Sequence, residues 1–147
     1  ERSPLFQNMT NYQIRKAILI SELQTFSAGE LLVEQDSFGR SLFLILDGRA
    51  EVVCRDDGQA RQVAVLGAGT VLGEVGYVRE IERTADVRAL DDVQALRFDF
   101  ERMRRDLRYF PRIVAALNFN ISRILGERLA DAMSPMTTHT DIEEPQS

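Results

Sequence analysis

The residues whose types and spacing could carry chemistry lie in one stretch, LGEVGYVREIERTADV, residues 72–87. Gly73 allows a close backbone approach or a positive φ, and the carboxylate of Glu74 accepts hydrogen bonds from hydroxyl groups. Nine residues after Glu74, Arg83 offers a fork of donors that matches a phosphate. A nucleotide carries both a phosphate and a hydroxyl on one small molecule, so the spacing favours a nucleotide site. A surface ion pair between Glu74 and Arg83 is the alternative that the spacing alone leaves open.

A helical turn directly after Glu74 would strengthen such a site. If Val75 to Val78 start a turn of helix, their backbone N–H groups favour an anion. An anion between this turn and Arg83 would then be held from two sides. We therefore expect the backbone around Val75 to take part in ligand binding together with the Glu74 and Arg83 side chains.

Short apolar runs alternate with Gly-containing turns from residue 24 to residue 98. Runs of this kind at this spacing predict strands of a sandwich or barrel. The dipeptide Asp57-Gly58 predicts a hairpin between two of them, and Leu42–Leu46, apolar on both faces, is expected in the middle of the structure. The predicted strands are 30–33, 42–46, 50–54, 63–66 and 93–98.

Helical patterns flank this region on both sides. Residues 8–23 predict a helix that Thr10 caps, with Gln13 completing a capping box. After residue 98, Asp99 can cap a short helix, 100–107, and Pro111 suits the first turn of a longer helix that runs to about Ala132. We expect one domain over residues 1–132, with the barrel at 24–98, the C-terminal helices at 99–132 and a disordered acidic tail at 133–147.

The composition narrows the class of protein. A chain of 147 residues is about one domain, and its net charge of −5 argues against direct nucleic-acid binding. No apolar run approaches the roughly 20 residues of a membrane span, and no secretory signal is visible. One cysteine, Cys54, suits a reducing compartment, and a single histidine, His139, argues against a metal site. We expect a cytoplasmic protein that is not an enzyme and has no metal or cofactor.

The stretch LGEVGYVREIERTADV resembles the phosphate-binding cassette of the cyclic-nucleotide-binding domain family. The residues in register with that cassette are Gly73, Glu74, Gly76, Arg83, Thr84 and Ala85. The segment FSAGELLVEQDSFGRSLFLILDGRAEV resembles the first strands of the family, and LGAGTVLGE resembles the turn that leads into the cassette. The resemblance covers about residues 10–132.

The resemblance implies an eight-stranded jelly-roll barrel, mainly β, with an N-terminal helix and two C-terminal helices. It implies that Glu74 binds the ribose 2′-hydroxyl and that Arg83 pairs with the cyclic phosphate. The family usually covers the base with the long helix after the barrel, which makes Arg128 or Leu129 a candidate lid contact. The implied ligand residues are Gly73, Glu74, Val75, Gly76, Arg83, Thr84 and Ala85.

Some positions depart from the family pattern or leave the ligand open. Glu82 stands where a Pro is common, which would lower affinity unless the side chain points to solvent. Asp36 stands where a Gly is common, and Asp tolerates a left-handed turn better than most residues. Thr84 offers a hydroxyl that cyclic GMP sites often use but bacterial cyclic AMP receptors also carry. Cyclic AMP is favoured over cyclic GMP on family frequency.

The long C-terminal helix has an apolar stripe with two readings. It can pack on the barrel of its own chain, or part of it can form a two-helix seam with a second copy, because the spacing is that of a heptad. We expect a homodimer through residues 111–132, and we expect Asn118, Asn120 and Ser122 to face solvent. The stripe consists of Val114, Leu117, Ile121, Ile124 and Leu125.

The favoured hypothesis is a sensor that moves its C-terminal helices when it captures a cyclic nucleotide and so acts on a protein partner that the sequence does not identify. One alternative is a scaffold or dimerisation module of the same fold that has lost its ligand. Another is the sensor part of a transcription regulator of the bacterial type, whose DNA-binding region is absent from this chain. An enzyme of the cupin type, also a jelly roll, would need several metal-binding histidines.

Overall fold

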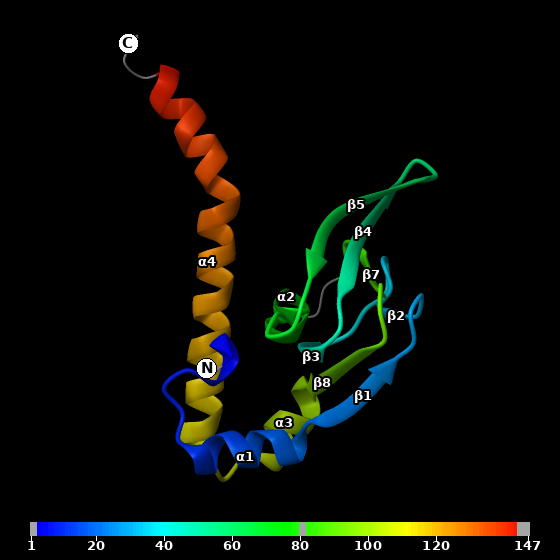
Figure 1. Cartoon of the computed structure of the whole chain (residues 1–147). Coiled ribbons are helices and arrows are strands. Elements are labelled where there is room, and N and C mark those ends of the chain that lie inside the picture. The colour runs from blue at the N-terminus through cyan, green and yellow to red at the C-terminus, as the bar shows by residue number, and fades with distance from the viewer. Residues whose placement is uncertain (1–2, 80–81, 144–147) are drawn as a thin grey trace.

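The computed structural model describes residues 3–79 and 82–143, and for residues 134–143 it describes the backbone alone. Within these residues the chain forms a mainly β core flanked by helices (Figure 1). The strands are β1 (Glu22–Phe26), β2 (Leu31–Val33), β3 (Ser41–Asp47), β4 (Ala50–Asp56), β5 (Gln59–Leu66), β6 (Val71–Leu72), β7 (Asp86–Ala89) and β8 (Val93–Asp99). The helices are η1 (Pro4–Phe6), α1 (Asn11–Ile20), α2 (Glu74–Val78), α3 (Phe100–Asp106) and α4 (Pro111–Glu143).

The strands form two antiparallel sheets of four strands each, in the orders β1-β8-β3-β6 and β2-β7-β4-β5. This order, in which the first strand pairs with the last, is the strand order of a jelly roll. The predicted mainly β class is confirmed, whereas the described residues show two sheets and not a closed barrel. The β4–β5 hairpin turns at Asp57 and Gly58, whose φ values of 51° and 78° are those of a type I′ turn.

Three strands were not predicted from the sequence. β1 begins at Glu22, inside the segment predicted as the N-terminal helix, and pairs with β8 from Glu22↔Arg97 to Phe26↔Val93. β6 has only two residues and β7 only four. Strands this short are defined by the partners they pair with, because so few residues carry no periodicity of their own.

The core has two parts that β3 separates. Leu42 and Leu44 point to one side of β3, into a cluster shared with α3, α4 and η1. Phe43 and Ile45 point to the other side, into the cluster between the two sheets. Alternation along a strand places successive side chains on opposite faces, so a run that is apolar on both faces belongs in the interior. The predicted central position of this strand is confirmed.

The two helix N-caps predicted from the sequence, at Thr10 and Asp99, are both present in the structure. The Thr10 hydroxyl accepts from the Gln13 N–H at 3.1 Å, and the Gln13 side chain accepts from the Thr10 N–H at 2.9 Å. Asp99 caps α3 by accepting from the Arg102 N–H at 3.0 Å. These local signals fix the start of each helix because they satisfy N–H groups that have no partner within the helix.

α4 differs from the prediction at its end. It continues through Pro135 to Glu143, whereas the sequence predicted a helix end near Ala132 and a disordered tail. Helical hydrogen bonds are local, so a polar segment can extend an existing helix without apolar partners. Residues 144–147 of the predicted tail lie outside the described residues. Figure 1 shows the last turns of α4 running beyond the level of α2 and η1.

The apolar stripe of α4 is used mainly within the chain. Leu117, Ile121 and Ile124 are buried in the core cluster, and Val114 and Leu125 pack against it. The expectation that Asn120 faces solvent is wrong, since this residue is 1% exposed. Its side-chain amide donates to the carbonyls of Leu5 at 2.7 Å and Gln7 at 3.0 Å, which ties the N-terminal η1 to α4.

No helix within the described residues combines the length and the apolar character that crossing a lipid bilayer requires.

Candidate ligand-binding site

A pocket of about 520 Å³ opens between the second sheet, α2 and α4. Its volume lies within the range of small-molecule sites. All seven residues that the resemblance implied as ligand contacts line it, and so does Arg128 of α4. The lining consists of Val33, Val52, Leu66, Leu72, Gly73, Glu74, Val75, Gly76, Glu82, Arg83, Thr84, Ala85, Val87 and Arg128. Residues 80 and 81, which lie between the two halves of the predicted cassette, are outside the described residues.

Gly73 begins the helical side of the pocket. It takes a left-handed conformation with φ of 83° directly before α2. A Cβ at this position would lie 2.6 Å from the Ser41 carbonyl oxygen, so the position excludes side chains on both conformational and steric grounds. The predicted helical turn after Glu74 is confirmed as α2. Gly73 therefore lets the chain turn from β6 into α2 while it passes close to β3.

Arg83 lies in a slot lined by glycines. A Cβ at residue 76 would lie 2.6 Å from Arg83 Nη1, and one at residue 39 would lie 3.6 Å from Nη2. Nη2 donates to the Ser41 carbonyl at 3.0 Å. A methyl group at residue 76 would displace the guanidinium, whereas one at residue 39 would lie in ordinary van der Waals contact with it. The bare backbone at Gly76 is therefore what makes room for Arg83 next to α2.

The charge of Arg83 has no carboxylate partner among the residues that the structure describes. The side chain is half-buried, and burial lowers the pKa of Arg83 because desolvation disfavours the charged form. Buried charges in proteins are normally paired. A half-buried, unpaired guanidinium that faces a pocket therefore provides a site for an anion.

Glu74 has a different environment at the same pocket. It is 6% exposed, and its carboxylate forms an ion pair with the guanidinium of Arg128. Arg128 also donates to the Val71 carbonyl, and burial lowers the pKa of Arg128. α4 thus reaches the pocket through Arg128, which meets the acid and does not stand free as a lid. Leu129, the other candidate lid residue, is 61% exposed and does not line the pocket.

Glu82, whose orientation the sequence left open, is exposed and lies on the pocket lining. Thr84 is also exposed, and both it and Ala85 line the pocket beside Arg83.

The pocket also has an apolar wall, contributed by β2, β4, β5, β6 and β7, that was not predicted from the sequence. Inward-facing alternation along these strands is a signal for it, but the register between strands was needed to bring the residues together. This wall consists of Val33, Val52, Leu66, Leu72 and Val87.

The pocket offers anion, hydroxyl and apolar contacts but no metal-binding cluster. Among the described residues, no three His, Cys, Asp or Glu side chains come together in a way that could hold a metal ion. The arrangement therefore suits a small anion with a hydroxyl and an apolar or planar part.

A model of the cyclic nucleotide-binding domain matches residues 23–108, more than half of the chain. The chain belongs to the cyclic nucleotide-binding domain family. The matched residues include the whole cassette, residues 72–87, with Glu74 and Arg83. The family membership that the sequence resemblance predicted is therefore confirmed.

The proteins with similar sequences include a receptor protein and an ion channel. The chain is 27% identical over 131 residues to the cyclic AMP receptor protein of Thermus thermophilus, which covers 88% of this chain and 59% of that protein. It is 31% identical over 122 residues to the cyclic nucleotide-gated channel alpha-4 of Mus musculus, covering 79% of this chain and 21% of the channel. The chain thus spans about one fifth to three fifths of these curated relatives.

The fold is similar to the crystal structure of Thermus thermophilus catabolite activator protein, with a TM-score of 0.81 and 25% sequence identity. The likeness covers 94% of this chain and 63% of that one. Family and fold therefore agree on a cyclic-nucleotide-binding domain.

Proposed function

We propose that this domain is a sensor that binds cyclic AMP in preference to cyclic GMP and passes the binding event to its C-terminal helices. The observation that carries the proposal is the half-buried guanidinium of Arg83, which faces the pocket without a carboxylate partner in the described residues. The printed name of a relative, the cyclic AMP receptor protein, supports the choice of nucleotide.

In the proposed complex, the cyclic phosphate binds Arg83. Of its three donor nitrogens, Nη2 is used by the Ser41 carbonyl, which leaves Nε and Nη1 without an acceptor in the described residues. The ribose 2′-hydroxyl donates to Glu74, whose carboxylate has room for more than one donor besides Arg128. The base then lies against the apolar wall near Val33 and Val52. Thr84 and Ala85 complete the phosphate side.

The link to the C-terminal helices is the ion pair between Glu74 and Arg128. A hydroxyl that binds Glu74 changes the electrostatic environment of Arg128, which belongs to α4. The ligand can shift α4 only by as much as it binds one placement of the helix better than another. We propose that this difference is expressed through Arg128 and is transmitted to a protein partner. The domain then acts by binding and not by catalysis.

We further propose that two copies associate through α4. The buried stripe of α4 already serves its own chain, but a second face remains exposed, with Phe119 and Leu129 each more than 60% exposed. Positions on this face are spaced three and four apart, which is the spacing of a two-helix seam. The seam consists of Phe119, Ser122, Gly126, Leu129 and Met133.

Two alternatives belong to the same fold. A ligand-free scaffold is disfavoured, because the half-buried charge of Arg83 would then have no anion to bind in the pocket. The sensor part of a transcription regulator is compatible with the pocket, since a cyclic AMP receptor protein is among the relatives and this chain spans 59% of it. A cytoplasmic location fits a ligand made inside cells and remains part of the proposal.

Calorimetric titration with cyclic AMP and cyclic GMP tests the proposal. Arg83→Ala should weaken cyclic AMP binding at least tenfold, because each lost charge-assisted hydrogen bond is worth about 1.5–3 kcal/mol. Arg61→Ala is the matched control, since Arg61 is an exposed residue of β5 outside the pocket. Absence of heat with both nucleotides would support the scaffold. Equal affinity of wild type and Arg83→Ala would place the phosphate elsewhere.

A further inference from the structure

The backbone of Arg83 is held by a loop outside the pocket. The Arg83 N–H donates to the Ser37 carbonyl at 2.7 Å, and the Asp36 N–H donates to the Arg83 carbonyl at 2.8 Å. Both polar backbone groups of Arg83 therefore bind one loop, residues 34–37. A side chain that must meet a ligand is only as well placed as the groups that hold its backbone. The position of this loop thus bears directly on the position of the guanidinium.

This loop has an unusual conformation. Asp36 has a φ of 69°, as the departure from glycine at this position led us to expect. A non-glycine residue in this region persists only where its surroundings hold it. The Ser37 hydroxyl donates to the Glu34 carbonyl at 2.5 Å and closes the turn locally. Hydrogen bonds to Gln35 from outside the loop restrain it further.

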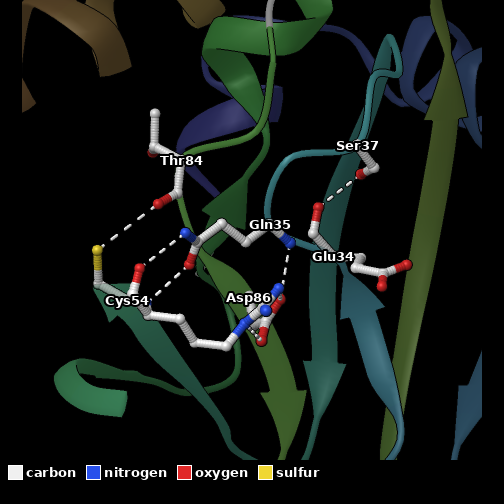
Figure 2. Close-up of polar contacts among 7 residues, drawn as sticks. Glu34, Gln35, Ser37, Cys54, Thr84 and Asp86 are labelled. Atoms are coloured by element: carbon white, nitrogen blue, oxygen red, sulfur yellow. Dashed lines mark hydrogen bonds and ion pairs between the residues drawn. The ribbon is translucent and has the colours of Figure 1, made fainter. Parts of the chain in front are cut away.

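Gln35 makes these bonds with its backbone and with its side chain. The Gln35 N–H donates to Asp86 Oδ1 at 2.7 Å. The side-chain amide of Gln35 exchanges two hydrogen bonds with the backbone of Arg55, which donates to Oε1 at 2.8 Å and accepts from Nε2 at 2.9 Å. Figure 2 shows the Gln35 side chain pointing to the strand that carries Cys54 and its backbone nitrogen pointing to Asp86. Through these hydrogen bonds, Gln35 connects the loop to both β4 and β7.

Asp86 completes the connection. It is 3% exposed and accepts from Arg55 Nε at 2.9 Å and from Nη2 at 3.3 Å. Burial alone would raise the pKa of Asp86, but the bonds from Gln35 and Arg55 and the charge of Arg55 outweigh it and lower the pKa. Asp86 follows Arg83 by three residues along the chain. The pocket lining includes none of Gln35, Arg55 and Asp86.

We infer that Gln35, Arg55 and Asp86, here called the Asp86 network, are positioning residues for Arg83. They fix the loop that binds the Arg83 backbone and so set where the guanidinium meets the phosphate, without touching the ligand. The effect on nucleotide affinity rests on the proposed function, whereas the effect on the Arg83 backbone does not.

Amide hydrogen exchange tests the network without any ligand. Asp86→Asn and the milder Gln35→Ala should each speed exchange of the Arg83 amide at least tenfold, while amides of β3 keep their wild-type rates. Asp91→Asn is the matched control, since Asp91 binds Arg49 with similar distances of 2.8 and 3.2 Å but away from the pocket. If Gln35→Ala and Asp86→Asn both leave the Arg83 amide at its wild-type rate, the inference is overturned.

Nucleotide affinity provides the second measurement, as a double-mutant cycle. Asp86→Asn should weaken cyclic AMP binding about tenfold, yet it should cost nothing more in the Arg83→Ala background, because the network acts through Arg83. In the Glu74→Ala background, Asp86→Asn should still weaken cyclic AMP binding about tenfold. A full additional loss in the Arg83→Ala background would overturn the positioning role. If wild type binds neither nucleotide, the proposed function fails, and the exchange experiment still decides the inference.

Discussion

Arg128 of α4 and Glu74 at the start of α2 form an ion pair inside the pocket. The two side chains differ in environment, since the Glu74 side chain is 8% exposed and that of Arg128 is 43% exposed. The Glu74 carboxylate is buried within the fold, and the Arg128 guanidinium reaches it from a helix whose next five residues, 129–133, are exposed. In this pair, α4 contacts one of the groups that the proposed ligand would bind.

Replacing Arg128 by Met should uncouple α4 from the pocket. Methionine keeps much of the volume but removes the charge, so a ligand on Glu74 would have no partner on the helix to act on. In wild type, cyclic AMP should change amide exchange in α4 around residue 128, and in Arg128→Met this change should be lost. Arg123→Met is the control, because Arg123 lies on the same helix but donates to the Pro4 carbonyl of η1, away from Glu74. An unchanged response in Arg128→Met would contradict coupling through this pair.

Gly76→Ala should weaken nucleotide binding while the fold is retained. The new methyl group would lie 2.6 Å from Arg83 Nη1 and 3.0 Å from the Gly39 carbonyl oxygen, so Arg83 must move. Alanine is the better helix former by about 1 kcal/mol, so α2 itself should not suffer. We expect at least a tenfold loss of cyclic AMP affinity by calorimetry with little change in melting temperature. Gly126→Ala on α4, where an added Cβ would meet nothing within 4 Å outside the neighbouring helix backbone in the described residues, should leave affinity unaltered.

The pair of Asp86 and Arg55 should make stability depend on pH in the acidic range. The pKa of Asp86 is lowered in the folded protein, so its contribution is complete above the ordinary pKa of about 3.9 and is lost as the pH falls through the folded value. Urea unfolding should show a constant difference between wild type and Asp86→Asn from pH 7 to about pH 5, and a shrinking difference below about pH 4. A difference that grows on acidification would have the wrong sign.

Asn120→Leu should destabilise the protein although it inserts an apolar residue into an apolar cluster. The substitution leaves the carbonyls of Leu5 and Gln7 without the amide that now binds them. The Leu5 carbonyl lies at a fully buried residue, and an unsatisfied buried carbonyl costs about 1–3 kcal/mol, so a loss of about 1–3 kcal/mol in unfolding free energy is expected. Asn118→Leu, at an exposed position two residues away, should change stability by less than about 0.5 kcal/mol. Equal effects of the two variants would argue against the role of Asn120.

Much of the fold was accessible from local patterns. The capping box of Thr10 and Gln13, the cap at Asp99 and the turn at Asp57-Gly58 each satisfy or shape the backbone within a few residues, so the sequence alone reveals them. The pocket's polar residues were accessible for another reason, because Gly73, Glu74 and Arg83 lie in one continuous stretch that resembles a family motif.

The features that the sequence could not supply depend on contacts between distant segments. Nothing near Arg128 indicates that it meets Glu74, since the pair exists only because α4 packs beside α2. Asn120 looked like a polar residue on a solvent face, and only the placement of η1 explains its burial. The role of Asp86 likewise depends on Gln35 and Arg55, which come from other strands and loops.

The strand order has a consequence for when the pocket can form during folding. β7, which follows Arg83 almost directly, pairs with β2 and β4, and these strands are made much earlier in the chain. Strands that are distant in the sequence pair slowly, because the intervening chain loses conformational entropy before the contacts between the strands can stabilise it. During synthesis, a partly made chain would carry Glu74 and later Arg83 without holding them in place. The proposed nucleotide site should therefore form late in folding, after both sheets have been synthesised and β7 has paired with β2 and β4.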